Sequence, residues 1–176
     1  MSERRRLSPL LWGAAALVLL IDQATKRTVR TSLIEGQSAS LSPWLAPVFR
    51  VTYVTNSGAA FGLFPDFSRV FVVVGIVVVA ALVWFSLEFA HDHRWMQWAL
   101  GLQLGGAAGN LLDRLLFSGS VVDFIDLSFW PLRRWPVFNL ADASIVVGVG
   151  LLILLLLQEG SRESHRSMPV ATAEDD

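Results

Sequence analysis

Long apolar runs alternate with polar stretches along the chain, and this pattern predicts its main elements. The first apolar run, 10–21, follows Ser8 and Pro9, which suit an N-cap and the first position of a helix. A helix from Pro9 to about Thr31 would be about 33 Å long, enough to cross a bilayer. Three more spans are predicted from the apolar runs at 70–89, 95–116 and 140–157.

The stretches between the apolar runs predict loops, one strand and a tail. Residues 48–55 are rich in β-branched and aromatic side chains, which favours a strand, and the turn-forming segment Asn56-Ser57-Gly58 follows them. The second long loop, 117–138, holds tryptophans and prolines typical of a membrane interface. Residues 159–176 are polar and predict a disordered tail, so that residues 1–158 form a single domain.

The composition is that of an integral membrane protein. The 176 residues are 53% hydrophobic and 16% charged, whereas a soluble domain is about 25% charged. The net charge of −1 gives no electrostatic reason to expect a nucleic-acid partner. The sequence contains no cysteine, which excludes a thiol nucleophile, a disulfide framework and a thiolate metal site. We therefore expect an all-α membrane protein with four transmembrane helices.

Four spans in an up-and-down arrangement place both termini on one side of the membrane. Lys and Arg are more numerous on the loop side, but Arg4, Arg5 and Arg6 precede the first helix, which usually dominates orientation. The triple arginine favours cytoplasmic termini, although the residue counts leave the orientation open. On either orientation, the end of the first helix, both long loops and the start of the last helix share one membrane face.

Most of the unusual polar residues fall on that shared face. Asp22 and Lys26 are four residues apart and can pair on one side of a helix. Ionisable groups at the edge of hydrocarbon are costly, so their convergence from several helices predicts a site. Each residue also has a simpler interpretation. The simpler roles are an ion pair for Asp22 with Lys26, interfacial anchoring for Asn110 with Arg114, and an N-cap for Asn139.

The chemistry available at this face is that of carboxylates and amides. All three histidines are predicted on the opposite face, so neither a Ser-His pair nor a histidine metal centre is expected, and no metal or cofactor is required. Two carboxylates in a low-dielectric pocket share a proton, so that one can act as general base on water while the other acts as acid. Asp123 and Asp142 suit this best, because each lies where a loop meets the membrane edge. Asp126 is an alternative to Asp123 as the first catalytic carboxylate, and the residues around the two do not decide between them. Asp142 also has a simpler interpretation, as an acidic residue in the first turn of a helix that the helix dipole favours.

Five short blocks in this region carry a family resemblance. They are Asp22-Gln23-Ala24-Thr25-Lys26, Asn56-Ser57-Gly58-Ala59-Ala60-Phe61-Gly62, Gly105-Gly106-Ala107-Ala108-Gly109-Asn110-Leu111-Leu112-Asp113-Arg114, Val121-Val122-Asp123-Phe124 and Phe138-Asn139-Leu140-Ala141-Asp142. They are similar to the D-Q-x-[ST]-K, N-x-G-x-A-F-G, G-G-x-x-G-N-x-x-D-R, V-V-D-F and F-N-x-A-D blocks of lipoprotein signal peptidase, also called signal peptidase II. The likeness covers residues 9–157, in order and without a departure at a motif position.

The resemblance implies an aspartic endopeptidase that hydrolyses the amide bond before the diacylglyceryl-modified cysteine of prolipoproteins. It implies Asp123 and Asp142 as the catalytic pair, which decides against Asp126. The residues that it implies around the substrate are Asn56, Gly58, Asn110, Arg114 and Asn139, with Asp22 and Lys26 in the pocket wall.

The same resemblance implies a small β cradle and a mobile flap in the extracytoplasmic loop between the first two helices. It places the protein in the bacterial inner membrane, with cytoplasmic termini and the site at the outer leaflet. The implied partners are diacylglyceryl-prolipoproteins, membrane lipids and globomycin-type inhibitors.

Two other functions are compatible with a small polar membrane protein. A transporter or proton relay would use Asp22, Asp113, Asp123 and Asp142, but these carboxylates gather at one face and do not cross the membrane. A non-catalytic scaffold would assemble through the glycines at 101, 105 and 109, which favour close helix packing. The scaffold leaves the convergent polar residues unexplained.

Overall fold

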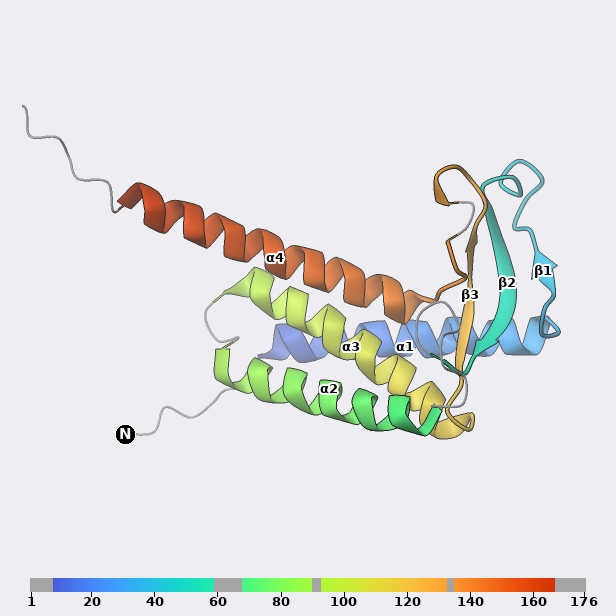
Figure 1. Cartoon of the computed structure of the whole chain (residues 1–176), viewed down its shortest axis with the longest axis horizontal. Coiled ribbons are helices and arrows are strands. Elements are labelled where there is room, and N and C mark those ends of the chain that lie inside the picture. Colours follow the sequence, from blue (N-terminus) through green and yellow to red (C-terminus); the bar gives the residue numbers. More distant parts are fainter. Residues whose placement is uncertain (1–7, 59–67, 90–92, 133–134, 167–176) are drawn as a thin grey trace, which may run out of the picture.

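The computed structural model describes residues 8–58, 68–89, 93–132 and 135–166. The four helices alternate in direction, and a small sheet lies at one end of the bundle (Figure 1). The elements are α1 (Pro9–Ser32), β1 (Ser38–Ala39), β2 (Phe49–Asn56), α2 (Ser68–Phe89), α3 (Arg94–Leu116), β3 (Val121–Leu127) and α4 (Leu140–Arg166).

Helix α3 is the centre of the bundle and packs against each of the other three helices. Small residues allow these close approaches. A Cβ atom at Gly105 would lie 2.6 Å from the carbonyl oxygen of Ala15, and one at Gly101 would lie 2.7 Å from that of Leu11. Both glycines therefore let the α1 backbone come close to α3. All three glycines of the predicted seam face α1 at close range.

Helix α1 begins where the sequence predicted. The Ser8 hydroxyl accepts a hydrogen bond of 3.3 Å from the Leu11 backbone N–H, and Pro9 occupies the start of the helix. Helix α4 begins at Leu140 as predicted, but it ends at Arg166, whereas the sequence analysis ended it at Leu157. The apolar run stops at Leu157, but a polar sequence rich in helix formers continues a helix equally well. The predicted tail is therefore helical over 159–166, and its remainder lies outside the described residues.

Length and apolar composition identify two helices that can cross a membrane among the described residues. They are the segments Ser68–Glu88 of α2 and Leu140–Gly160 of α4. Helices α1 and α3 have similar lengths but carry buried charged side chains near the sheet. In α3, uncharged polar residues such as Gln97, Gln103 and Asn110 also lower the mean hydropathy, so hydropathy alone does not select these two helices.

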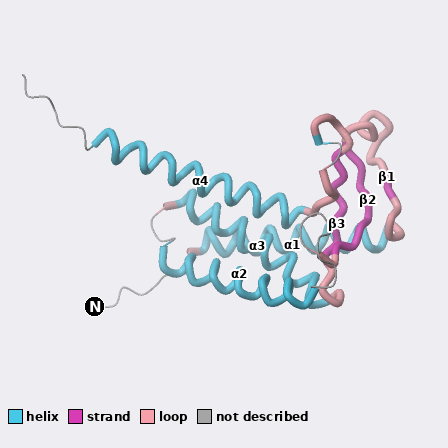
Figure 2. The backbone as a smooth tube through the Cα atoms, viewed as in Figure 1, coloured by secondary structure: helices cyan, strands magenta, loops and turns pink. Residues whose placement is uncertain are grey.

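The sheet has three antiparallel strands in the order β1-β2-β3 (Figure 2). Strand β2 matches the strand predicted at 48–55. Strand β3 was missed, because 121–127 was taken as part of a loop. The prediction placed the sheet only in the connection between the first two helices. The sheet instead joins both long connections, because β3 lies in the second one. The flap predicted in that first connection cannot be assigned, because 59–67 lies outside the described residues.

Candidate active site

Pairing of β3 with two distant segments sets the geometry of the site. Asp123 of β3 lies opposite Val54 of β2, and Val121 lies opposite Asn56. On its other side, β3 is bridged by Phe138, whose carbonyl accepts hydrogen bonds of 3.0 Å and 2.7 Å from the N–H groups of Phe124 and Ile125. This bridge brings the residue after Phe138, and the start of α4, beside Asp123.

Asn139 links the two aspartates that the sequence analysis selected. Its backbone N–H donates to Asp142 Oδ2 at 3.2 Å, and its side-chain oxygen accepts from the Asp142 backbone N–H at 2.9 Å. This is a reciprocal capping box at the start of α4. The Asn139 Nδ2 group also donates to Asp123 Oδ1 at 2.7 Å and to Asn110 Oδ1 at 3.1 Å. Asn139 is fully buried, so the predicted N-cap also holds both carboxylates in place.

Asp123 is buried in this arrangement, with 3% of its surface exposed. Besides the Asn139 bond, its Oδ2 atom accepts a hydrogen bond of 3.1 Å from Asn56 Nδ2. Burial raises the pKa of Asp123 to about 7, and the nearby charge of Asp142 adds to this effect, while the hydrogen bonds from Asn56 and Asn139 oppose it. Asp123 therefore gains or loses a proton close to neutral pH.

A turn fixes the orientation of the Asn56 amide. The Gly58 backbone N–H donates to Asn56 Oδ1 at 3.1 Å, which leaves Asn56 Nδ2 to donate to Asp123. Gly58, predicted to contact substrate, is buried and orients Asn56 through this bond.

Asn110 and Arg114 of α3 lie beside Asp142. Asn110 Nδ2 donates to Asp142 Oδ1 at 2.7 Å, and Arg114 Nη1 donates to the Asn110 carbonyl oxygen at 3.3 Å. The Nε atom of Arg114 is buried and has no hydrogen-bond partner among the described residues. Arg114 thus keeps an unused donor beside the aspartate pair.

Asp22 and Lys26 lie behind this layer, on the face of α1 that is turned toward the site. Lys26 is fully buried, and its Nζ atom lies 2.9 Å from Asp22 Oδ2 and 3.1 Å from Asp113 Oδ2. The same atom donates to Asn110 Oδ1 at 3.0 Å. Asp22 Oδ1 accepts a hydrogen bond of 3.0 Å from the backbone N–H of Ala141 in the first turn of α4. The predicted ion pair is therefore present, and it supports both Asn110 and α4.

Two members of this buried network were not predicted as site residues, namely Asp113 and Gln23. Asp113 is fully buried and accepts hydrogen bonds from Gln23 Nε2 at 3.0 Å and from the Val122 backbone N–H at 3.1 Å. It therefore ties α3 to the strand that carries Asp123. Both residues stand inside motif blocks, but only the fold shows that their side chains meet.

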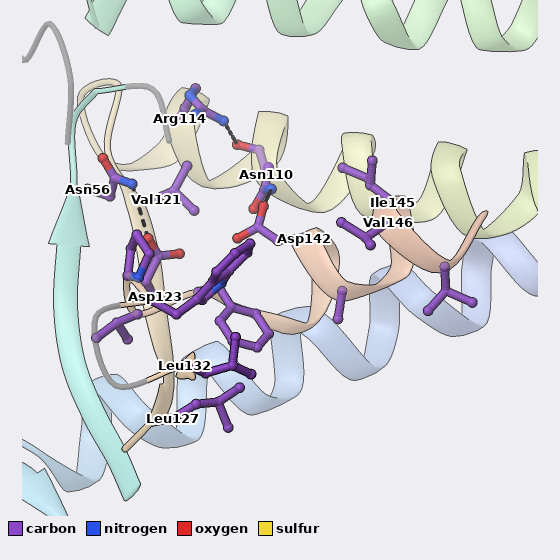
Figure 3. A pocket seen from close by; sticks show the side chains of 16 residues that line it. Asn56, Asn110, Arg114, Val121, Asp123, Leu127, Leu132, Asp142, Ile145 and Val146 are labelled. Carbon is purple, nitrogen blue, oxygen red and sulfur yellow. Dashed lines mark hydrogen bonds between the residues drawn. The ribbon is translucent and has the colours of Figure 1, made fainter. Parts of the chain in front are cut away.

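A cavity of about 560 Å³ opens beside the aspartate pair (Figure 3). Five predicted site residues contribute to its lining, which combines this polar end with an apolar wall from the loop before α4 and from α4 itself. The lining residues are Asn56, Asn110, Arg114, Val121, Asp123, Leu127, Leu132, Trp135, Pro136, Val137, Phe138, Asp142, Ala143, Ile145, Val146 and Val147. The apolar residues of this wall were not predicted.

Asp126, the rival carboxylate, does not line this cavity. It stands three residues after Asp123, and side chains at odd spacing point to opposite faces of a strand. Its Oδ2 atom accepts a hydrogen bond of 2.8 Å from the Thr52 hydroxyl and lies 3.5 Å from Arg50 Nε. Asp126 thus has a structural role within the sheet.

Metal ligands and histidines are not part of the described site. No group of three His, Asp or Glu side chains in the described ranges is arranged to hold a metal ion. His93 occupies the N-cap position of α3 without a side-chain capping hydrogen bond. Helix α3 begins at the end of the bundle away from the sheet (Figure 1). His91 lies outside the described residues.

Comparisons with known proteins point to one family. The sequence model of the family described as Signal peptidase (SPase) II matches residues 14–158. The lipoprotein signal peptidase of Moorella thermoacetica is 46% identical over 143 residues, which are 81% of this chain and 89% of that protein. The lipoprotein signal peptidase of Desulfitobacterium hafniense is 41% identical over 154 residues, which are 88% of this chain and 97% of that protein.

Solved structures agree with the sequence comparisons. A structure described as a bacterial membrane enzyme is 35% identical, with a TM-score of 0.79 over 89% of this chain and 92% of that one. A second structure with the same description is 37% identical, with a TM-score of 0.73 over 82% of this chain and 90% of that one. The likeness thus covers the helices and the sheet together.

Proposed function

Because the chain belongs to the signal peptidase II family, we propose that Asp123 and Asp142 are the catalytic pair with which it cleaves prolipoproteins. The protein is a membrane-embedded peptidase that removes signal peptides in lipoprotein maturation. The observation that carries the assignment of the pair is the bridge by Asn139, which bonds both carboxylates where they line one cavity.

The proposed reaction is attack of water on the amide bond before the diacylglyceryl-modified cysteine. With one proton on the pair, the ionised carboxylate acts as the base that takes a proton from water. The protonated carboxylic acid gives its proton to the carbonyl oxygen as the water oxygen bonds to the carbonyl carbon. The carbon–nitrogen bond then breaks, the nitrogen leaves with the proton taken from water, and one hydroxyl of the former carbonyl carbon returns its proton to the pair. The products are a carboxylic acid and the free amine of the cysteine.

Side chains around the pair suit the remaining needs of this reaction. Arg114 lines the cavity, and its guanidinium group can donate a hydrogen bond to a substrate carbonyl. Asn56 and Asn139 hold Asp123 through hydrogen bonds, and Asn110 holds Asp142. The apolar part of the cavity suits the acyl chains, which require surroundings without water.

We also propose how the protein lies in the membrane. All four helices cross it, α1 and α3 with their charged residues turned inward, and residues 1–158 act as one unit. The sheet then rests at the outer leaflet of the bacterial inner membrane, with the exposed side chains of Trp44 and Trp130 at the interface. Both termini are cytoplasmic in this arrangement, as Arg4, Arg5 and Arg6 favour.

A proton relay is not favoured by the arrangement of the carboxylates. The segments of α2 and α4 that are long and apolar enough to cross a membrane contain few charged residues. The aspartates of the candidate site and of the network behind it all lie near the sheet. A relay would require titratable groups at successive depths of the membrane.

Cleavage by the purified protein tests this function. We expect the protein in detergent to release the signal peptide from a diacylglyceryl-modified prolipoprotein, as measured by mass spectrometry, and globomycin to inhibit the reaction. The same prolipoprotein with an unmodified cysteine is the matched control and should remain intact. Failure to cleave the modified substrate would refute the proposed function.

The pH dependence of the same reaction follows from the environment of Asp123. Its raised pKa, about 7, keeps one proton on the pair up to neutral pH, and the pair becomes doubly ionised at higher pH. We therefore expect kcat/KM to fall as the pH rises through about 7, with the apparent pKa belonging to the pair. An Asp126→Asn variant should give the same profile. A rate that is constant up to pH 9 would contradict the proton-sharing pair.

A further inference from the structure

A second cavity, of about 440 Å³, adjoins the first and shares Asp123 with it. The residues that line it are Val54, Thr55, Asn56, Ser57, Asp123, Pro136 and Val137. Its wall is thus formed by the end of β2, the turn that follows and the segment before α4. Thr55 is exposed, so this cavity reaches the outer surface of the protein at the end of β2 and does not lie inside the helix bundle.

The two cavities meet at the candidate catalytic residue. Asn56, Asp123, Pro136 and Val137 line both of them. An amide bond placed at Asp123 therefore borders both cavities, and each of the two substrate segments that flank this bond can enter a different one.

The surroundings of the two cavities differ in polarity. The larger cavity extends along α4 as far as Val147, on a helix whose length and composition suit a membrane span. The smaller cavity offers the hydroxyl-bearing residues Thr55 and Ser57 and the amide of Asn56. The Thr55 hydroxyl also donates to the Glu35 carboxylate, which adds an acidic group beside this wall.

We propose that the smaller cavity receives the polypeptide on the carboxyl side of the scissile bond, which is the first segment of the mature lipoprotein. This inference rests on the proposed function, because it requires a peptide bond to be cleaved at Asp123. The signal peptide and the acyl chains are apolar and need the membrane side. The mature polypeptide is hydrophilic and must reach water, and the smaller cavity leads from the same aspartate to the exposed end of β2.

The test compares two substrates on variants that fill the smaller cavity. Both substrates carry the signal peptide and the diacylglyceryl cysteine, but the short one ends in an amide at that cysteine and the long one continues into a mature lipoprotein segment. We expect Ser57→Trp and Thr55→Trp to raise KM for the long substrate about tenfold, because the indole occupies space that the segment needs. KM for the short substrate and kcat for both should stay near wild-type values. Ser40→Trp, at an exposed position beside β1, is the matched control.

The outcomes separate this inference from the function on which it rests. A selective rise in KM for the long substrate, in either variant, supports the proposed route. An equal effect on both substrates overturns it and assigns the cavity a role in water access or in stability. The absence of any effect on either substrate overturns it as well. If the wild-type protein cleaves neither substrate, the proposed function itself fails.

Discussion

Asp123→Asn and Asp142→Asn will each reduce cleavage of a diacylglyceryl-prolipoprotein by about 10⁴-fold or more. An amide has nearly the shape of a carboxyl group but can neither take a proton from water nor deliver one to a leaving amine. Because Asn139 bonds both aspartates, each substitution leaves the other carboxylate in position but without its catalytic counterpart. The measurement is kcat/KM for the purified variants in detergent.

Controls distinguish lost chemistry from lost structure in these variants. Both should elute from a sizing column and unfold on heating as the wild-type protein does, because the helices pack through other residues. Asp126→Asn changes a carboxylate of the same strand whose partners are Thr52 and Arg50, and it should retain most of the activity. Near wild-type activity in Asp123→Asn or Asp142→Asn would refute the catalytic pair. Loss of activity in Asp126→Asn would mean that Asp126 must again be considered as the catalytic carboxylate of β3 in place of Asp123.

The largest effect on stability is expected for Lys26→Met. The ammonium group of Lys26 is fully buried between Asp22 and Asp113, and methionine would fill the space without supplying a positive charge. Removing one partner of a buried ion pair costs about 3–5 kcal/mol, because the other charge stays buried without compensation. Two carboxylates are left in that state here. We therefore expect a strongly lowered unfolding temperature in detergent, together with loss of cleavage.

A second substitution on the same helix provides the comparison for Lys26. Arg27 is exposed, so Arg27→Met removes the same charge without uncovering a buried carboxylate and should unfold close to the wild-type temperature. Adding Asp22→Asn and Asp113→Asn to Lys26→Met removes the uncompensated charges and should recover part of the lost stability. An unfolding temperature of Lys26→Met equal to that of the wild type would show that this network does not support the fold.

Several polar side chains make a structural contact and also contact a residue of the proposed site. Asn139 caps α4 and also donates to Asp123. Asp22 pairs with Lys26 and also accepts from the Ala141 N–H at the start of α4. Structural polar residues that fix the start of α4 therefore also fix Asp142, which lies in its first turn. The choice between packing and function at these positions cannot be made from sequence spacing alone.

Local sequence patterns were enough to identify the helices, the strand β2 and the family. Apolar runs, the Ser8 cap and the β-branched segment before Asn56 act over a few residues, so their structural consequences are local and can be recognised without a fold. The motif blocks identified the family and, with it, the reading of Asp123 and Asp142 as the pair. The end of α4 was placed too early, because a polar sequence can remain helical after the apolar run stops.

The way in which these elements form a site depends on long-range contacts. Strand β3 exists because it pairs with β2, about 70 positions earlier, and the bridge from Phe138 carries Asn139 to Asp123. The contacts of Asp113 with Gln23 and Lys26, and the two cavities that meet at Asp123, also join segments far apart in the chain. Strand pairing and the burial of charge depend on which partners the whole fold supplies, and this information is not contained in any local pattern.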